Sequence, residues 1–382
     1  MNRSVKYIGY YDKPELSIKE NRTFFVAATN KMTYIGNVIA KNGCNVEIIS
    51  PSPTSNTKGF YGRRVNKISD NIILKLCPSV GANNIVAKGI RKFLSQGWLY
   101  LQLLLHTKSS DTVFVYHSLA LMRTVRICKV LKRFKLILEV EEIYGDVVGS
   151  EVISKREIKF TQIADGFLFP TELLNKKINV KHKPAAIIHG TYQAEPNRHC
   201  EFGDGKIHVV YAGTFDPQKG GAAAAVAAAE FLDERYHVHI IGFGKESEKP
   251  NLLKAIHDVS KLTQCTITYD GLLSGEDYIR FIQSCDIGLS TQNPALAFND
   301  TSFPSKVLSY LANGLRVVSI RIKALETSAV NDVLCYYDDN SPKVIAEAIK
   351  SVDCSKPYDS RGLIEKLNCD FSTAIKRLLE KL

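Results

Sequence analysis

The chain has 382 residues, 45% of them hydrophobic and 23% charged, which is typical of a globular protein with room for two domains. No apolar run reaches the roughly 18–20 residues that cross a bilayer, and the first residues lack the apolar core of a signal peptide. We therefore expect a cytoplasmic protein and exclude the integral membrane class.

The net charge of +11 is concentrated in the first half. Residues 1–190 carry 29 Lys and Arg against 14 Asp and Glu, whereas the remaining residues carry 21 against 25. This asymmetry indicates that the first half meets something anionic: nucleic acid, an acidic lipid surface or a diphosphate-linked acceptor. Charge alone does not choose between these, nor does it exclude a basic face that serves only solubility.

Short β-branched or aromatic runs alternate with helical patterns along the first half, which is typical of α/β layers. The predicted strands there are 5–10, 46–50, 72–76, 112–116, 135–140, 166–169 and 185–188. The predicted helices are 24–42, 86–106 and 119–131, and Gly43 follows the first of them as a C-cap glycine would.

The same alternation restarts after residues 190–206, a polar stretch that we interpret as an interdomain linker. Its predicted strands are IHVVY, HVHIIG, TITYDG, DIGLS, RVVSI and LCYY, separated by helical patterns such as the alanine-rich AAAAVAAAEFLDE and a helix over about 304–313. The predicted architecture is two Rossmann-like α/β domains, 1–190 and 191–382, with a last helix that could cross back to the first domain.

The nine cysteines are scattered, with no C-x-x-C pair and no Cys/His cluster at metal-ligand spacing. Their odd number and the length of the chain argue against a disulfide framework. We expect most of them to be small buried hydrophobic residues, and we expect no metal site.

Three loops of the second half lie where open α/β sheets bind ligands, beyond the carboxyl ends of strands. AGTFDPQKGG (212–221) and NDTSFPSK (299–306) lead into helix N-termini and carry Lys219 and Lys306, so both are expected to hold phosphate. IIGFG (240–244) ends a buried strand in glycines that could admit a base or ribose. Each loop taken alone is also compatible with an ordinary structural turn.

The order and spacing of these loops resemble the donor-binding domain of the retaining glycosyltransferases of family 4, which have the GT-B fold. AGTFDPQKG is similar to the glycine-turn-lysine loop of that family, and IIGFG to its mid-domain glycine turn. YDGLLSGEDYIRFIQSCDIGLS and SFPSKVLSYLANGLRVVS resemble its loop, helix and strand before the nucleotide site and its nucleotide-holding helix. The resemblance covers roughly residues 185–320, and it implies two Rossmann-like domains facing each other across a cleft.

The resemblance implies a set of donor-binding residues, with Lys219 at the diphosphate and acting in catalysis. They are Gly213, Thr214, Lys219, Gly242, Gly244, Thr301, Ser302, Phe303, Pro304, Ser305, Lys306 and Ser309. The sequence departs from the family at one pair of positions. Thr301 and Ser309 replace two glutamates that usually contact the sugar and the ribose, so hydroxyls stand where the family has carboxylates.

On the acceptor side, His117 ends the predicted strand 112–116 and is expected to face the cleft as a catalytic or acceptor-binding group. Glu141 follows the next strand, and Tyr10 and Tyr11 follow the first, where acceptors commonly approach. Each has a plainer interpretation as a structural residue or part of a solvated loop.

Basic residues accompany apolar ones on two predicted helices of the first half. Lys88, Arg91 and Lys92 precede GWLYLQLLL, and the later helix carries Arg123, Arg126, Lys129, Lys132 and Arg133. This pattern suits a helix resting on an anionic membrane, although the leucines could equally be core.

The leading hypothesis is a glycosyltransferase that moves a hexose or similar sugar from a nucleotide-diphosphate donor to a glycan or lipid-linked acceptor. We expect it in the cytoplasm, where it could also bind the inner face of the membrane. UDP-sugar is favoured over GDP-sugar, no cofactor is expected, and the absence of a D-x-D motif removes the need for a catalytic metal. Retention of configuration is implied by the resemblance alone.

The alternatives are a non-catalytic partner subunit of the same fold and a nucleotide-sugar epimerase. Nucleic-acid binding ranks last, because no recognisable binding module accompanies the basic residues.

Overall fold

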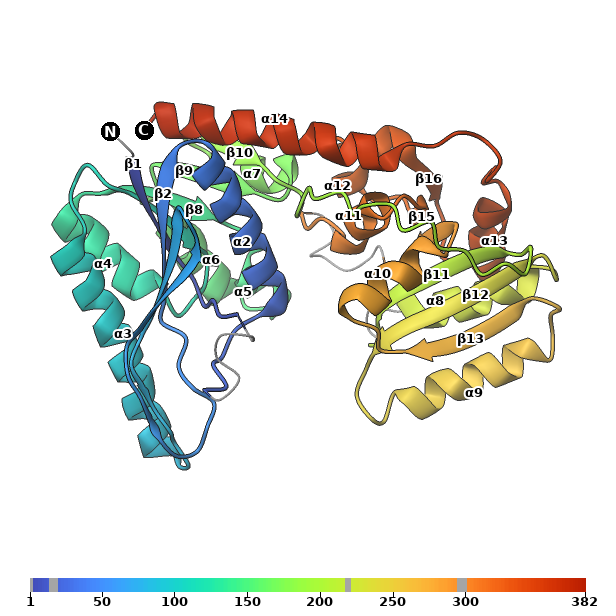
Figure 1. Ribbon diagram of the computed structural model, residues 1–382, viewed down its shortest axis with the longest axis horizontal. Coiled ribbons are helices and arrows are strands. Elements are labelled where there is room, and N and C mark those ends of the chain that lie inside the picture. Colours follow the sequence, from blue (N-terminus) through green and yellow to red (C-terminus); the bar gives the residue numbers. More distant parts are fainter. Residues whose placement is uncertain (1–2, 14–19, 217–220, 294–300) are drawn as a thin grey trace. The chain divides into compact units, whose positions relative to one another are not determined.

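The computed structural model describes residues 3–13, 20–216, 221–293 and 301–382. The chain divides into two units, each built on a mainly parallel sheet with helices against it (Figure 1). Unit 1 comprises Met1–Thr191 together with Asp370–Leu382, and unit 2 comprises Tyr192–Cys369. The sequence predicts a boundary at 190/191 and a last helix that could cross back to the first domain, and the end of that helix, from Asp370, belongs to unit 1.

The sheet of unit 1 has eight strands in the order β10-β9-β8-β7-β1-β2-β5-β4, all parallel except the β4–β5 pair. Their bounds are β1 Arg3–Ile8, β2 Cys44–Ser50, β4 Arg64–Ser69, β5 Ile72–Leu76, β7 Thr112–Tyr116, β8 Lys135–Glu139, β9 Gly166–Phe169 and β10 Ala185–Ile187. The strand order reverses between β1 and β7. Central strands such as β7 and β9 are continuous apolar runs, as strands covered on both faces must be.

Helices flank this sheet, with α3 and α4 on one side and α2 on the other (Figure 1). Their bounds are α2 Val26–Lys41, α3 Ile85–His106, α4 Met122–Lys132, α5 Tyr144–Val147, α6 Glu151–Thr161 and α7 Glu172–Ile178. The main core lies under α3, α4 and α6, where Leu99, Val125 and Phe160 pack on strand residues such as Val113 and Phe167.

Unit 2 has a six-stranded, wholly parallel sheet in the order β13-β12-β11-β14-β15-β16. Its strands are β11 Ile207–Thr214, β12 Tyr236–Phe243, β13 Thr266–Gly271, β14 Ile287–Ser290, β15 Arg316–Ile320 and β16 Leu334–Tyr337. Its helical elements are α8 Gly221–Ala228, η1 Ala229–Phe231, α9 Lys249–Ser260, α10 Gly275–Gln283, α11 Ser305–Ala312, α12 Lys323–Glu326, η3 Asn331–Val333 and α13 Pro342–Lys350. The last helix, α14 Ser360–Glu380, is shared by both units. The order reverses at β11, between β12 and β14, so ligand binding is expected beyond the carboxyl end of β11.

The predicted elements are largely confirmed: β5, β7 and β9 have the predicted bounds, and α11 lies within the predicted 304–313. The prediction missed β4, which runs antiparallel to β5, and the small ribbon of β3 Phe60–Tyr61 and β6 Ser79–Val80. β4 alternates half-buried and exposed residues without strong apolar character, because it forms one edge of the sheet. Among the described residues, no helix is both long enough and apolar enough to span a bilayer.

Candidate functional site

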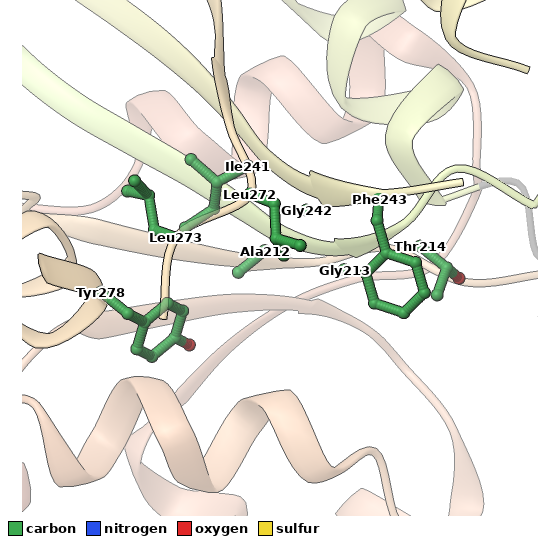
Figure 2. Close-up of a pocket in the computed structure, with 9 residues that line it drawn as sticks. All are labelled: Ala212, Gly213, Thr214, Ile241, Gly242, Phe243, Leu272, Leu273 and Tyr278. Carbon is green, nitrogen blue, oxygen red and sulfur yellow. The ribbon is translucent and has the colours of Figure 1, made fainter. Parts of the chain in front are cut away.

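A pocket of about 240 Å³ opens at the carboxyl ends of β11 and β12, where the strand order predicts a ligand site (Figure 2). Backbone of the two strands forms one wall, and the loop after β13 and helix α10 add side chains. The lining residues are Ala212, Gly213, Thr214, Ile241, Gly242, Phe243, Leu272, Leu273 and Tyr278. Three of the predicted donor-binding residues, Gly213, Thr214 and Gly242, are thus brought together.

Close packing explains both pocket glycines: Gly242 lies against the backbone of Gly213, and Gly213 lies against two side chains. Gly242 has φ +132°, and a Cβ built on it would lie 1.9 Å from the carbonyl oxygen of Gly213. A Cβ on Gly213 would lie 3.0 Å from Nζ of Lys306 and from the hydroxyl of Tyr211. Side chains at either position would therefore displace the strands or fill the wall of the pocket.

Lys306 lies beside this wall on the first turn of α11. Its Nζ is 3.9 Å from the ring centroid of Tyr211, a cation–π contact. The Tyr211 hydroxyl donates to the carbonyl oxygen of Thr214 at 3.1 Å, and burial raises the pKa of Tyr211 to about 12. Pro304 is the N-cap, so the positive end of the α11 dipole and the Lys306 ammonium both favour an anion at this helix N-terminus.

Tyr278 is a pocket residue that the sequence analysis did not single out. It comes from α10, lines the pocket, and its hydroxyl lies 3.0 Å from Oγ of Ser309 on α11. Burial raises the pKa of Tyr278 above its usual value, so the phenol remains neutral. Ser309 is therefore connected to the pocket through Tyr278.

Among the described residues, the others predicted to bind the donor do not line this pocket directly, and their environments differ. Gly244 lies outside the pocket, where a Cβ would be 2.6 Å from Oε2 of Glu248 and 2.9 Å from Cβ of Phe215. Ser302 has a buried Oγ without a hydrogen-bond partner among the described residues. Thr301 and Phe303 are half-buried beside the start of α11. Lys219 lies outside the described residues, so its predicted role stays a prediction.

In unit 1, His117, which the sequence predicts to face the cleft as a catalytic or acceptor-binding group, has a buried side chain. Its Nε2 lies 2.6 Å from Oε1 of Glu157, and both side chains are only 1% exposed. Glu157 also accepts hydrogen bonds from the backbone N–H groups of Tyr144 and Gly145. The imidazole stacks on Phe160, with ring centroids 5.8 Å apart. Through Glu157 of α6, His117 is therefore connected to the backbone at the start of α5.

Tyr11 is likewise corrected, since its side chain is fully buried and its hydroxyl lies 2.9 Å from Oγ1 of Thr33. Tyr10 is half-buried, and its hydroxyl accepts a hydrogen bond from Nε2 of Gln96 at 3.1 Å. Burial raises its pKa above the usual value.

Glu141 is partly exposed, and both its carboxylate oxygens accept from Nζ of Lys31, at 2.6 and 2.8 Å. Lys31 also donates to the carbonyl oxygen of Ile188 at 3.2 Å. Of the predicted acceptor residues, Glu141 and Tyr10 thus remain accessible in part, and Glu141 is already paired with a cation.

In unit 2 the structure brings together three histidines that the sequence analysis did not group. His208, His237 and His239 offer ring nitrogens that all lie within 4.8 Å of one another. The signal was the H-x-H spacing of HVH inside a predicted strand, because residues two apart on a strand point to the same face.

Comparison with known proteins finds that part of unit 2 is similar to a glycosyltransferase family. Residues 206–352 match the family model described as Glycosyl transferases group 1. This stretch contains the pocket, α10 and α11. The match does not specify family 4, which remains a prediction. No curated protein matches the sequence.

Solved structures match nearly the whole chain. One, described as trehalose-6-phosphate from E. coli bound with UDP-2-fluoro glucose, has a TM-score of 0.67 at 8% identity and covers 99% of this chain and 97% of that chain. The α,α-trehalose 6-phosphate synthase of Burkholderia multivorans has a TM-score of 0.67 at 11% identity, with 99% and 94% covered. That of Burkholderia xenovorans in complex with glucose-6-phosphate has a TM-score of 0.64 at 9% identity, with 99% and 98% covered. The chain therefore has the GT-B fold, with two Rossmann-like units.

Proposed function

We propose that this chain is a glycosyltransferase that takes a sugar from a nucleotide-diphosphate donor bound in the pocket of unit 2. The observation that carries the proposal is the arrangement of the pocket at the carboxyl end of β11, with the α11 N-terminus and Lys306 beside Gly213. The family match over residues 206–352 supports it.

The pocket suits the two ends of such a donor differently. The apolar side chains of Ile241, Leu272 and Leu273 offer a surface for a nucleoside base. Lys306 and the first turn of α11 offer positive charge for the diphosphate. In the transition state the departing diphosphate gains negative charge, which these fixed groups stabilise electrostatically. The UDP-2-fluoro glucose in the E. coli structure makes UDP the first nucleotide to test.

A nucleotide-binding measurement tests this assignment. Removing one charge that contacts phosphate costs a charge-assisted hydrogen bond, so Lys306→Met should raise the Kd for UDP about 10- to 100-fold. Methionine keeps an unbranched apolar stem over the Tyr211 ring, and the Kd for uridine should change little. Isothermal titration calorimetry gives both values, and Lys343→Met, exposed on α13, serves as the control. Unchanged UDP affinity in Lys306→Met would remove the diphosphate assignment.

The acceptor side of the proposal rests on a second pocket, in unit 1. This pocket of about 610 Å³ lies between α4 and α6, and it is lined by Leu119, Met122, Arg123, Arg126, Ile127, Ile153, Arg156, Lys159 and Phe160. The salt bridges among the described residues include none of its four cations. Exposed apolar side chains continue from it along α4 at Val130 and Leu131.

Cations above an apolar floor are suited to an anionic amphiphile, with the phosphate at the arginines and the hydrocarbon against the leucine and isoleucine side chains. We therefore propose that the acceptor is carried on a lipid phosphate and that unit 1 meets an anionic membrane surface. Transfer to such an acceptor belongs to glycan or glycoconjugate synthesis. Lys129, which the sequence groups with these cations, is instead paired with Asp165 at 2.5 Å.

Retention of configuration and independence from a divalent metal remain parts of the proposal taken from the family resemblance and from the lack of a D-x-D motif. A non-catalytic partner subunit is the second candidate, because Thr301 and Ser309 place hydroxyls where the resemblance expects carboxylates. It would bind nucleotide in the same pocket without turnover.

A further inference from the structure

Three histidines lie on one face of the sheet in unit 2. His208 is on β11, and His237 and His239 are on the neighbouring β12, with His208 opposite His237 in the register. Because side chains alternate between the faces of a strand, His237 and His239 point to the same side. One nitrogen of each ring lies within 4.8 Å of the other two.

Two of these rings, those of His208 and His239, each have one nitrogen beside a carboxylate, which we call the outer nitrogen. Nε2 of His208 lies 2.8 Å from Oδ1 of Asp204, and Nδ1 of His239 lies 3.0 Å from Oδ2 of Asp270. A carboxylate oxygen accepts hydrogen bonds, so each of these contacts places a ring proton on the nitrogen beside the carboxylate.

The inner nitrogens of the same two rings face each other. Nδ1 of His208 and Nε2 of His239 are 2.9 Å apart. If both outer nitrogens carry protons and both rings are neutral, two lone pairs meet at this distance and repel. A cation between them, either a proton or a metal ion, removes the repulsion. The two carboxylates supply the negative charge that such a cation needs in a buried place.

His237 distinguishes a metal ion from a shared proton. A proton uses only two nitrogens, whereas this cluster presents three. The Thr268 hydroxyl donates its proton to Asp270 at 2.9 Å. Its oxygen therefore accepts a hydrogen bond from Nε2 of His237, which lies 3.0 Å away. Nδ1 of His237 then keeps its lone pair.

We propose that His208, His237 and His239 bind one zinc-class divalent cation, with Asp204 and Asp270 orienting two of the ligands from behind. Three neutral imidazoles suit zinc, and a carboxylate behind a ligating histidine is the usual supporting arrangement. Zn–N bonds of about 2.0–2.1 Å in a tetrahedral site put ligand nitrogens about 3.3 Å apart. The His208 and His239 nitrogens need to separate by only about 0.4 Å from their present distance.

The site has a structural role rather than a catalytic one. His208 precedes Gly213 by five residues along β11, which is about 16 Å in a strand, so the ion lies far from the donor pocket. Phe202, in the segment before β11, stacks on His208 and His239 with ring centroids 4.2 and 4.9 Å apart. Metal binding would fasten this segment, through Asp204 and Phe202, to β11, β12 and β13. This inference does not depend on the proposed transferase function.

Metal binding by the full chain without an affinity tag tests the proposal. Protein treated with a chelator and dialysed should bind one equivalent of zinc, by titration and by elemental analysis. Its thermal unfolding midpoint should rise with zinc concentration, because the ion binds the native state. Cobalt(II) at the same site should give the visible bands of a tetrahedral ion without the charge-transfer band of a thiolate ligand, which separates the histidines from the free cysteines.

Variants locate the ion. His237→Gln, at a half-buried position, should abolish the cobalt bands and the zinc-dependent shift, while His257→Gln, exposed on α9, should retain both. Asp270→Asn should weaken zinc affinity about 10- to 100-fold. The proposal is overturned if wild-type protein binds no stoichiometric zinc, or if His237→Gln binds it as wild type does. The wild-type result decides this even if a variant fails to fold.

Discussion

Glu139 shows how burial changes the chemistry of one side chain in unit 1. Its carboxyl is fully buried at the end of β8 and accepts a hydrogen bond from the Tyr7 hydroxyl. Burial, reinforced by the nearby charge of Glu141, raises the pKa of Glu139 to about 8, against the opposing effect of Lys31. The folded protein therefore holds a proton on this group at neutral pH, whereas the unfolded chain, with a usual value of 4.5, does not.

The pH dependence of stability follows from this difference. Since the folded pKa is raised, the contribution of the bound proton is fully present below pH 4.5 and is lost as pH rises toward 8. Glu139→Gln, which keeps a neutral group of the same shape, should flatten the fall in the unfolding midpoint between pH 5 and 8. Thermal unfolding at several pH values measures this, and the exposed Glu151→Gln should follow wild type. Equal slopes in Glu139→Gln and wild type would show that Glu139 is not the responsible group.

At the scale of elements, sequence patterns predicted most of the two sheets because parallel strands covered on both faces are apolar runs separated by helical periods. The pocket glycines were also predictable, since a turn between a strand and a helix in such a sheet marks a ligand site. Side-chain direction at strand ends was harder to predict. Tyr11 and His117 both follow strands, yet packing turns both into the core.

Contacts between distant elements could not be read from spacing alone. Tyr278 meets Ser309 because α10 and α11 lie together at the pocket, and nothing local in either helix indicates this. The HVH spacing placed two histidines on one face, but the third ligand came from a neighbouring strand whose register the sequence did not give. The α4–α6 pocket likewise needed the tertiary structure to join two basic helices.

Helix α4 carries the prediction about membranes. Each cation near an anionic bilayer contributes about 1 kcal/mol, so Arg123→Ala with Arg126→Ala should weaken binding to phosphatidylglycerol vesicles roughly 30-fold. Sedimentation with vesicles measures this, and raised salt should weaken wild-type binding as well. Lys176→Ala with Lys181→Ala removes the same charge from exposed positions elsewhere in unit 1 and should change little. Equal binding to neutral phosphatidylcholine vesicles would contradict an electrostatic surface.

For the whole molecule, the two units carry different parts of the proposed reaction. Unit 2 holds the pocket proposed to bind nucleotide and the stretch that matches glycosyltransferases of group 1, and unit 1 holds most of the excess positive charge. A transferase needs both a donor site and an acceptor site, and this division supplies one candidate for each. Binding of nucleotide alone does not separate an enzyme from a non-catalytic relative of the same fold.

Turnover by the purified chain tests the central claim most directly. The protein is incubated with UDP-, GDP- and ADP-sugars, with and without a lipid-phosphate acceptor fraction, and released nucleoside diphosphate is measured. We predict release from one donor type, increased by the acceptor fraction, accompanied by sugar on the lipid and much reduced in Lys306→Met. Tight binding of UDP with no release from any donor, with or without acceptor, would contradict the account and identify a binding subunit instead.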